Sequence, residues 1–239
     1  MQISRFRSHK SLPSAYGILV FTMAAGIRPA AAAGTPARLE KAVAVLNKLA
    51  DTSGDGIRQE EIASADCVAV IPAFKKGAAA VGVSFGRGFI SCRNGANWSA
   101  PGAVALEGDS LGVQIGGEKI DIVILSLDKE RRAKVLSDRF TIGSDASAAW
   151  RNGKTAHGDP NAKILFFGHT KGAFAGFDLD GTTLKPDASS NKALYGKIIT
   201  NNEIVEGAAT PAVAQPFVSK LTFLLHHESA TASNPQTTQ

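Results

Sequence analysis

The spacing of apolar residues predicts a helix near the N-terminus, because residues 35–50 carry them on one helical face. Thr35 is a suitable N-cap and Pro36 suits the first helical position. Arg38, Lys41 and Lys48 lie mostly outside the apolar stripe. Such a helix either packs on a sheet or enters a membrane interface, and its alanine-rich apolar face favours packing. The apolar stripe is Leu39, Ala42, Val43, Leu46, Leu49 and Ala50.

From residue 67 onward, short apolar runs bounded by glycine, proline or asparagine predict strands. Gly86 and Gly88 are predicted to separate two strands, and Asn94-Gly95 to form a hairpin turn. The predicted strands are 67–72, 78–86, 87–93, 98–106, 112–117, 118–127, 140–150, 162–172 and 173–181. Further helices are predicted at 59–64, 128–138, 186–195 and 211–225. The chain is therefore predicted to be α+β, a single β-rich domain of twisted antiparallel sheet, barrel-like or sandwich, with N- and C-terminal helices.

In the stretch GVQIGGEKIDIVIL, residues 112–125, the alternating apolar residues occupy odd positions before Gly116-Gly117 and even positions after it. A bulge or kink is expected there, because an intact register would keep each face of the strand constant. Residues 122–125 are apolar on both parities, which predicts a strand covered on both faces. Glu118 and Asp121 could then cap backbone N–H groups, pair with a lysine or arginine, or line a pocket.

Residues 1–33 have the composition of a secretory signal peptide. Basic residues precede an apolar run at 16–27 that is short for a membrane span, and Ala31 to Ala33 offer a cleavage site. The alternative is a retained membrane anchor. The expected product is exported to the periplasm or the extracellular space, with a domain at 34–227 and a polar, disordered tail at 228–239.

Removing this leader changes the charge of the chain. The full sequence has a formal net charge of +5, and residues 1–33 hold four basic residues and no acid, so the remainder carries 5 − 4 = +1. A broad basic surface for nucleic acid is therefore not expected. Export also favours a disulfide between Cys67 and Cys92, worth about 3 kcal/mol by loop entropy, with two separate buried thiols as the alternative.

Motifs for catalysis, cofactors and metals are poorly represented. The sequence has no nucleophile elbow, Walker loop or complete dinucleotide fingerprint, so an enzyme or a cofactor is not expected. Residues 51–62 imitate a calcium loop but place Ile62 where a bidentate glutamate is needed. Asp178, Asp180 and Asp187 are better explained by a turn at Asp180-Gly181 and a helix cap at Asp187 than by a metal site.

Several segments, taken in order, resemble the SYLF (Ysc-eighty-four-like) domain family over roughly residues 39–225. They are CVAVIP with KKGAAAVGVSFGRG, WSAPGAV from Trp98, the glycine-rich strand with Gly116, Gly117, Glu118 and Asp121, FTIGSDAS, and the segment with Asp187 and the Asn-x-x-x-Tyr-Gly signature of Asn191 and Tyr195. The chain departs from the usual pattern at Lys119-Ile120, where the family has a smaller residue.

The resemblance implies a phospholipid-binding protein, with phosphoinositides as ligands of eukaryotic members and an N-terminal amphipathic helix contributing. Binding of anionic head groups needs cations beside an apolar surface. Candidate lipid-binding residues are Arg38, Lys41, Lys48, Lys75, Lys76 and Arg87. The expected function is non-enzymatic binding of phospholipid or an apolar ligand at the cell envelope. The alternative is an envelope protein that holds a protein partner, and the leader makes actin an unexpected partner.

Overall fold

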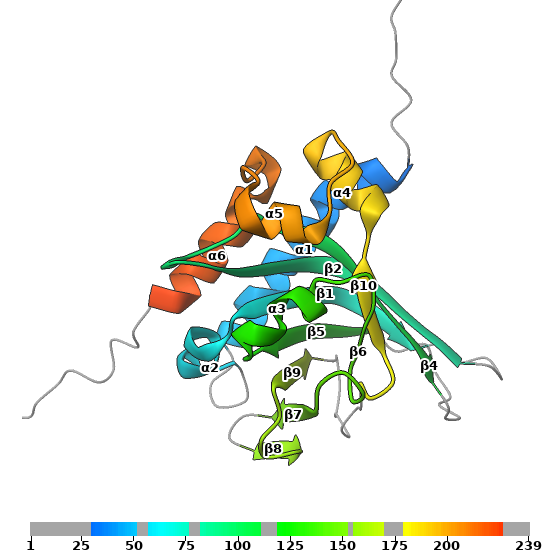
Figure 1. Ribbon diagram of the computed structural model, residues 1–239, viewed down its shortest axis with the longest axis vertical. Helices are drawn as coiled ribbons and strands as arrows, with labels where there is room; N and C mark the ends of the chain where they lie inside the picture. The colour runs from blue at the N-terminus through cyan, green and yellow to red at the C-terminus, as the bar shows by residue number, and fades with distance from the viewer. Residues whose placement is uncertain are drawn as a thin grey trace, which may run out of the picture.

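A curled ten-stranded sheet, with its two longest helices packed on one face, forms the protein (Figure 1). The computed structural model describes residues 30–51, 57–76, 82–110, 119–152, 155–169 and 179–226. The strand order is β6-β10-β4-β2-β1-β5-β9-β7-β8, and β3 pairs with β2 outside this path. Described pairings are antiparallel except for the parallel pair of β7 with β9. The predicted α+β class is confirmed, with this parallel pair as a departure from the predicted antiparallel sheet.

The elements have the following bounds. The strands are β1 (Cys67–Lys76), β2 (Gly82–Asn94), β3 (Asn97–Trp98), β4 (Gly102–Ser110), β5 (Lys119–Ser126), β6 (Phe140–Thr141), β7 (Ala148–Asn152), β8 (Thr155–Gly158), β9 (Ile164–His169) and β10 (Thr183–Pro186). The helices are α1 (Ala30–Asp51), α2 (Gln59–Ser64), α3 (Arg132–Val135), α4 (Ala188–Tyr195), α5 (Asn201–Gly207) and α6 (Gln215–His226), with 3₁₀ turns η1 (Lys129–Arg131) and η2 (Ala212–Ala214).

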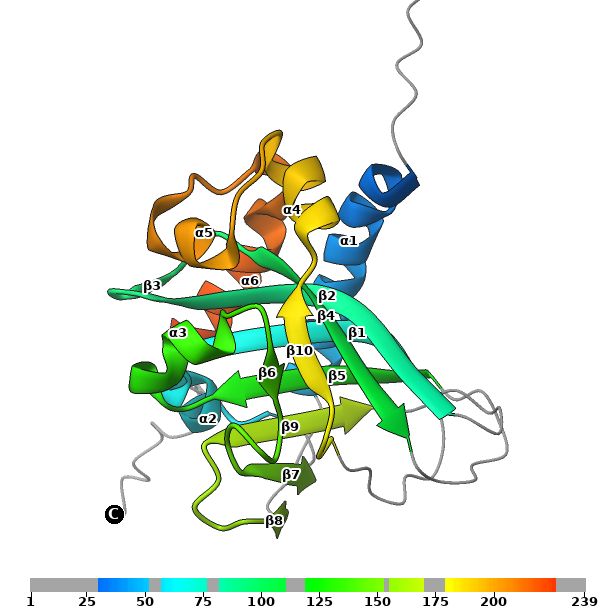
Figure 2. The same cartoon turned by 45° about the vertical axis from the view of Figure 1, so that its right-hand side comes forward.

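Each face of the sheet buries its own apolar core. On the face that we call the helix face, α1 and α6 pack on side chains such as Val70, Phe89 and Val123. On the other face the sheet curls, so that β6 and β10 come back over β5 and β9 and enclose a core that includes Phe140 and Ile122 (Figure 2). Residues 122–125 are buried on both faces, as the sequence predicts for a doubly covered strand.

Helix α1 lies on the sheet, where Leu39, Ala42 and Leu46 are almost fully buried. The apolar stripe therefore serves the core of the domain, because packing it there removes it from water. The helix begins at Ala30, so the predicted start at Thr35 is wrong. Pro36 lies inside the helix rather than at its first position.

The predicted break at Gly86 and Gly88 is also wrong, because β2 runs without interruption through both glycines. A Cβ at Gly88 would lie 1.8 Å from the Val70 carbonyl oxygen, and one at Gly86 would lie 2.6 Å from Ile71 Cγ2. These glycines allow β1 to approach β2 closely, which a sequence pattern alone reads as a turn.

Several other helix and strand boundaries differ from the predicted ones. The 128–138 helix shortens to η1 and α3, and the predicted 140–150 strand divides into β6 and β7. Pro186 joins β10 instead of the following helix, and β8, β10 and α5 were not predicted. The turn at Asn94-Gly95 is confirmed, with Gly95 in the left-handed region at a φ of 63°. Gly116, Gly117, Glu118, the strand at 112–117, most of the strand at 173–181, the centre of the calcium-like loop and the tail lie outside the described residues.

The described ranges contain neither a membrane-spanning helix nor a group of metal-binding side chains. None of the helices there combines the length and the hydrophobicity that crossing a membrane requires. Within the same ranges, no three His, Cys, Asp or Glu side chains are grouped closely enough to hold a metal ion.

Candidate anion-binding surface

Three cations of α1 share one side of the helix. At about 100° per residue, Arg38, Lys41 and Lys48 fall within an arc of roughly 80°. Arg38 reaches a residue at the start of α4, and Lys48 reaches Asp121 of β5. Lys48 thus meets β5 directly, and Arg38 shares its partner Asp187 with Arg87 of β2. This row of cations therefore borders the part of the helix face that α1 leaves uncovered.

The uncovered part of the helix face carries further cations. Lys75 of β1 lies directly opposite Phe85 of β2 on one side and Lys119 of β5 on the other. Arg87, two residues along from Phe85, places its guanidinium carbon 5.4 Å from the centre of that ring. Phe85 is one of the few large apolar side chains that remain exposed, at 36%. We call the following set the basic face: Arg38, Lys41, Lys48, Lys75, Arg87 and Lys119.

At one end of the basic face, two arginines surround the buried carboxylate of Asp187. Arg38 Nη1 lies 3.8 Å and Arg87 Nε 3.6 Å from Asp187 Oδ2. Arg38 Nη1 also donates to the Ser190 hydroxyl at 3.1 Å. Asp187 accepts hydrogen bonds from the hydroxyls of Ser189 and Ser190 and from the Ser190 backbone N–H, so it is the predicted cap of α4.

These contacts set the ionisation of the cluster. Burial alone raises the pKa of Asp187, but hydrogen bonds from Ser189 and Ser190 and the charge of Arg87 outweigh it and bring that pKa below its ordinary value. Burial lowers the pKa of Arg38, which Asp187 partly offsets. A guanidinium remains protonated under such conditions, so the cluster holds two positive charges and one negative charge.

The family-motif residues that follow Asp187 fasten α4 to the sheet. Asn191 accepts the Ala103 N–H at 2.7 Å and donates to Asn201, which in turn donates to the Ala103 carbonyl. Tyr195 donates its hydroxyl to the Pro101 carbonyl at 2.8 Å, and burial raises the pKa of Tyr195. Asp187, Asn191 and Tyr195 recur every four residues, so they share one face of α4, and their roles are structural.

At the other end, Asp121 makes two of the three kinds of contact that the sequence left open. Its Oδ1 accepts the backbone N–H of Ala73 at 2.9 Å, and its Oδ2 lies 3.3 Å from Lys48 Nζ. Ala73 has a φ of 51°, unusual for a residue other than glycine. The Asp121 carboxylate therefore accepts a backbone N–H from the irregular part of β1. Through Lys48 it also holds the C-terminal part of α1 against β5.

Lys75 and Lys119 differ from the other strand cation, Arg87, in their surroundings. Both are exposed, and among the described residues neither has a carboxylate within ion-pair distance. Lys41 on α1 is also exposed and has no described ion pair. Like charges directly opposite on neighbouring strands destabilise a sheet, so this pair is costly in the absence of an anion.

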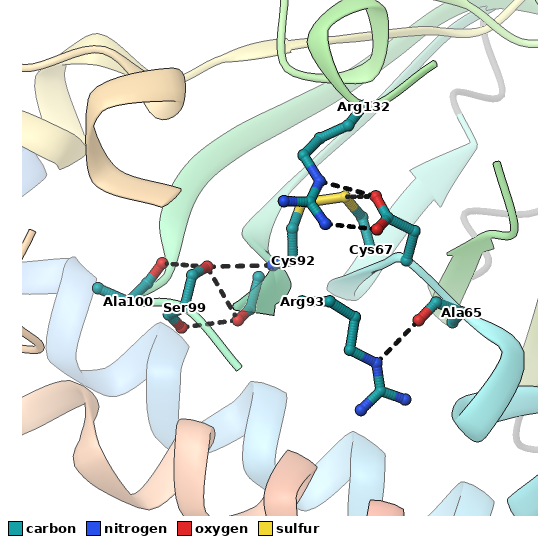
Figure 3. Close-up of a disulfide and its surroundings, with 9 residues drawn as sticks. Ala65, Cys67, Cys92, Arg93, Ser99, Ala100 and Arg132 are labelled. Atoms are coloured by element: carbon teal, nitrogen blue, oxygen red, sulfur yellow. Dashed lines mark hydrogen bonds and ion pairs between the residues drawn. A yellow bond between two sulfur atoms is a disulfide. The ribbon is translucent and has the colours of Figure 1, made fainter. Parts of the chain in front are cut away.

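The predicted disulfide joins Cys67 to Cys92 across the directly paired positions of β1 and β2 (Figure 3). Beside it, Arg132 of α3 makes a bidentate ion pair with Asp66. Both cysteines are almost completely buried, and the bond lies at the end of the sheet away from Lys75. This region is a structural clamp rather than part of the basic face.

The family-motif tryptophan has a related role near the disulfide. The Arg93 guanidinium carbon lies 4.2 Å from the Trp98 ring centre. Arg93 also donates to the Ile62 carbonyl and to the Ala65 carbonyl, the latter drawn in Figure 3. Trp98 itself is buried in the helix-face core. It therefore supports the packing of α2 and β3 and not the binding of a ligand.

The structure brings together five of the six predicted lipid-binding residues. The side chain of Lys76 lies outside the described residues, and Lys119 and Phe85 are additions that the sequence reasoning missed. Phe85, Arg87 and Phe89 alternate with Gly86 and Gly88, a strand signal that was present but was obscured by the glycines. Lys119 was visible only as a departure from the family pattern.

Comparisons with known proteins agree with the resemblance. Residues 107–224 match the family model Ysc84, described as "Las17-binding protein actin regulator". The chain is 34% identical over 142 residues to the SH3 domain-containing protein PJ696.02 of Schizosaccharomyces pombe, which covers 55% of this chain and 33% of that protein. It is 29% identical over 188 residues to the human SH3 domain-containing YSC84-like protein 1, covering 74% of this chain and 54% of that protein.

A third relative is Protein YSC84 of Saccharomyces cerevisiae, 28% identical over 131 residues, covering 51% of this chain and 28% of that protein. The chain thus spans between about a quarter and a half of the length of these relatives. No solved structure matches it. The matched family segment includes Lys119, Asp121 and α4, whereas α1, β1 and β2 precede it.

Proposed function

Because the chain belongs to the Ysc84 (SYLF) family through residues 107–224, we propose that it is a non-enzymatic binding protein that holds anionic phospholipid head groups on its basic face. The observation that carries the proposal is the pair of Lys75 and Lys119. They are exposed side by side, without a described carboxylate partner, next to the exposed ring of Phe85. A phosphate group bound between them would remove the repulsion that the free protein bears.

The surrounding residues suit a membrane surface. A lysine close to an anionic membrane contributes about 1 kcal/mol of attraction, and an aromatic ring can enter the interface beside it. Three of the six cations of the basic face pair with Asp121 or Asp187, and Glu107, opposite Phe85 on β4, is paired with Lys185. The attraction is therefore local to this surface, although the chain without its leader has little net charge.

The proposal includes export. Cleavage after Ala33 would remove the first four residues of α1 and place Pro36 in the first turn, where a missing N–H costs no hydrogen bond. A disulfide in the core suits an oxidising compartment. The family description refers to Las17 binding and actin regulation, but an exported protein would not meet actin. A protein partner at the envelope is the competing function.

Vesicle flotation tests the proposal directly. Protein purified from expressing cells, with its N-terminus read by mass spectrometry, is mixed with vesicles of phosphatidylcholine alone or with added phosphatidylserine or phosphoinositide. We expect flotation only with the anionic lipids, and loss of flotation in the Lys75→Glu/Lys119→Glu variant and at high salt.

A matched control changes the same charge elsewhere. Lys129 and Lys163 are exposed lysines near the opposite end of β5, where the Leu127 N–H donates to the Lys163 carbonyl. The Lys129→Glu/Lys163→Glu variant should float like the wild type. Equal recovery of all variants would remove the role of the basic face. Failure of every vesicle together with capture of an envelope protein would favour the competing function.

A further inference from the structure

Strand β1 contains one residue more than either neighbour between the same paired positions. Ile71 pairs with Ile122 and Phe74 with Ile120, so three steps along β1 match two along β5. Toward β2, five steps from Val70 to Lys75 match four from Phe89 to Phe85. The extra residue is a β-bulge at Pro72-Ala73, opposite Asp121.

This bulge decides which face Lys75 occupies. Successive side chains of a strand alternate between faces, so residues 71, 73 and 75 would share a face in a regular strand. Ile71 is part of the core on the curled face, and in a regular strand Lys75 would join it there. Because of the extra residue, Phe74 enters that core and Lys75 turns to the helix face, opposite Lys119.

The conformation at the bulge is held from the side of β5. Ala73 lies in the left-handed region, which costs free energy for any residue with a Cβ. Its N–H has left the regular ladder and is bound by the Asp121 carboxylate at 2.9 Å. The second oxygen of Asp121 faces Lys48, which ties the same point to α1.

On the other side of the bulge, β2 leaves room for it because two of its residues have no side chain. Gly86 and Gly88 flank the position across from the bulge, and a Cβ on either would collide with Ile71, Phe74 or the Val70 carbonyl. Three separate features therefore converge on one irregular residue pair: the glycines of β2, the left-handed Ala73 and the carboxylate of Asp121. Bulges commonly serve to redirect a side chain at a functional surface.

We propose that Asp121 is a positioning residue for the basic face: by accepting the Ala73 N–H, it holds the β1 bulge that places Lys75 beside Lys119. The proposal rests on the proposed function for its ligand, since Lys75 and Lys119 are the lysines assigned to the phosphate. It gives a negatively charged residue a favourable role in binding an anion.

The role predicts opposite results for two substitutions that remove the same charge. Asp121→Asn keeps an oxygen that accepts the Ala73 N–H, whereas Asp121→Ala does not. If Asp121 acted only through its charge, both variants would bind anionic vesicles more tightly, and to the same extent. We expect Asp121→Asn to bind as tightly as the wild type or up to several-fold tighter, and Asp121→Ala to bind several-fold more weakly.

A measurement without vesicles separates this proposal from the proposed function. Cysteines replacing Lys75 and Lys119 should cross-link readily, because opposed Cβ atoms in such a pair lie about 5 Å apart. Adding Asp121→Ala should lower the yield several-fold. Adding Ala73→Gly as well should restore it, since glycine adopts a positive φ without steric cost.

The cross-linking experiment tests the role of Asp121 whether or not lipid is the ligand. An unchanged cross-link yield in the Asp121→Ala background would overturn the proposal, as would equal tightening of vesicle binding in both Asp121 variants. Failure of the wild type to float would instead refute the ligand and leave the cross-link test of the bulge intact. In the wild type, the Ala73 amide should exchange slowly with solvent, and fast exchange would contradict its bond to Asp121 even if Asp121→Ala does not fold.

Discussion

The two ends of the basic face contain the same kind of residue in different surroundings. At one end, Arg38 and Arg87 converge on the buried Asp187, which also caps α4. At the other, Lys75 and Lys119 stand side by side in solvent without a described acid. The first arrangement uses cations to join α1, β2 and α4, whereas the second leaves cations available to an external anion.

The difference shows how burial of a carboxylate separates structural cations from the cations that we propose to bind an anion. A buried carboxylate needs its partners, because an unpaired charge in the interior is strongly destabilising. The arginines at Asp187 therefore contribute first to stability. Removal of an exposed, unpaired lysine costs the fold little or relieves repulsion, so its effect should appear in binding.

The largest expected effect follows from removing the shared acid. Asp187→Ala deletes the cap of α4 and leaves Arg38 and Arg87 facing each other, so we expect the free energy of unfolding to fall by about 3 kcal/mol. Urea denaturation measures the loss. Asp187→Asn retains a capping side chain and should lose less.

The matched comparison is the Lys75→Glu/Lys119→Glu variant, which should unfold within about 0.5 kcal/mol of the wild type. A loss of stability as large as that of Asp187→Ala would show that the two ends of the basic face are equally structural. The contrast drawn between them would then be wrong.

A smaller effect is expected at Lys41, which lies between the two ends on α1. It is exposed and has no described ion pair, so Lys41→Gln should leave the urea midpoint unchanged. Loss of one lysine near an anionic surface should weaken vesicle binding by about 1 kcal/mol, roughly five-fold. A titration with vesicles at fixed salt checks this, and unchanged affinity would remove Lys41 from the binding surface.

The smallest effect concerns acid pH. Contacts in the folded protein lower the pKa of Asp187, so its contribution to stability is complete above about pH 4, the range of an unfolded aspartate, and is lost as the pH falls further. Between about pH 4 and pH 2, the wild type should therefore lose more stability than Asp187→Asn. Parallel curves for the two proteins would show that Asp187 does not carry this dependence.

Some of this architecture was readable in the sequence. Asp187 was predicted to cap a helix because aspartate before a helical pattern commonly does so, and Cys67 and Cys92 were paired from their number and the leader. The apolar stripe of α1 matched its buried face. These features depend on local spacing or on composition, which a single chain displays directly.

The errors came where a distant strand decided the local structure. Gly86 and Gly88 were interpreted as a break because glycine commonly marks turns, but they accommodate the bulge of the neighbouring strand. The described bulge, at Pro72-Ala73, has no local signal, since Pro72 was interpreted as the end of a strand. The role of Asp121 likewise depends on a residue that lies 48 positions earlier.

By itself, the sequence determined that the protein would be α+β, with an amphipathic N-terminal helix, an Asp187 cap and a family resemblance that implies binding. Only the tertiary structure decided which cations are neutralised and which have no carboxylate partner among the described residues. That distinction depends on the register between strands and on the placement of two carboxylates, and both arise from contacts between residues far apart in the chain.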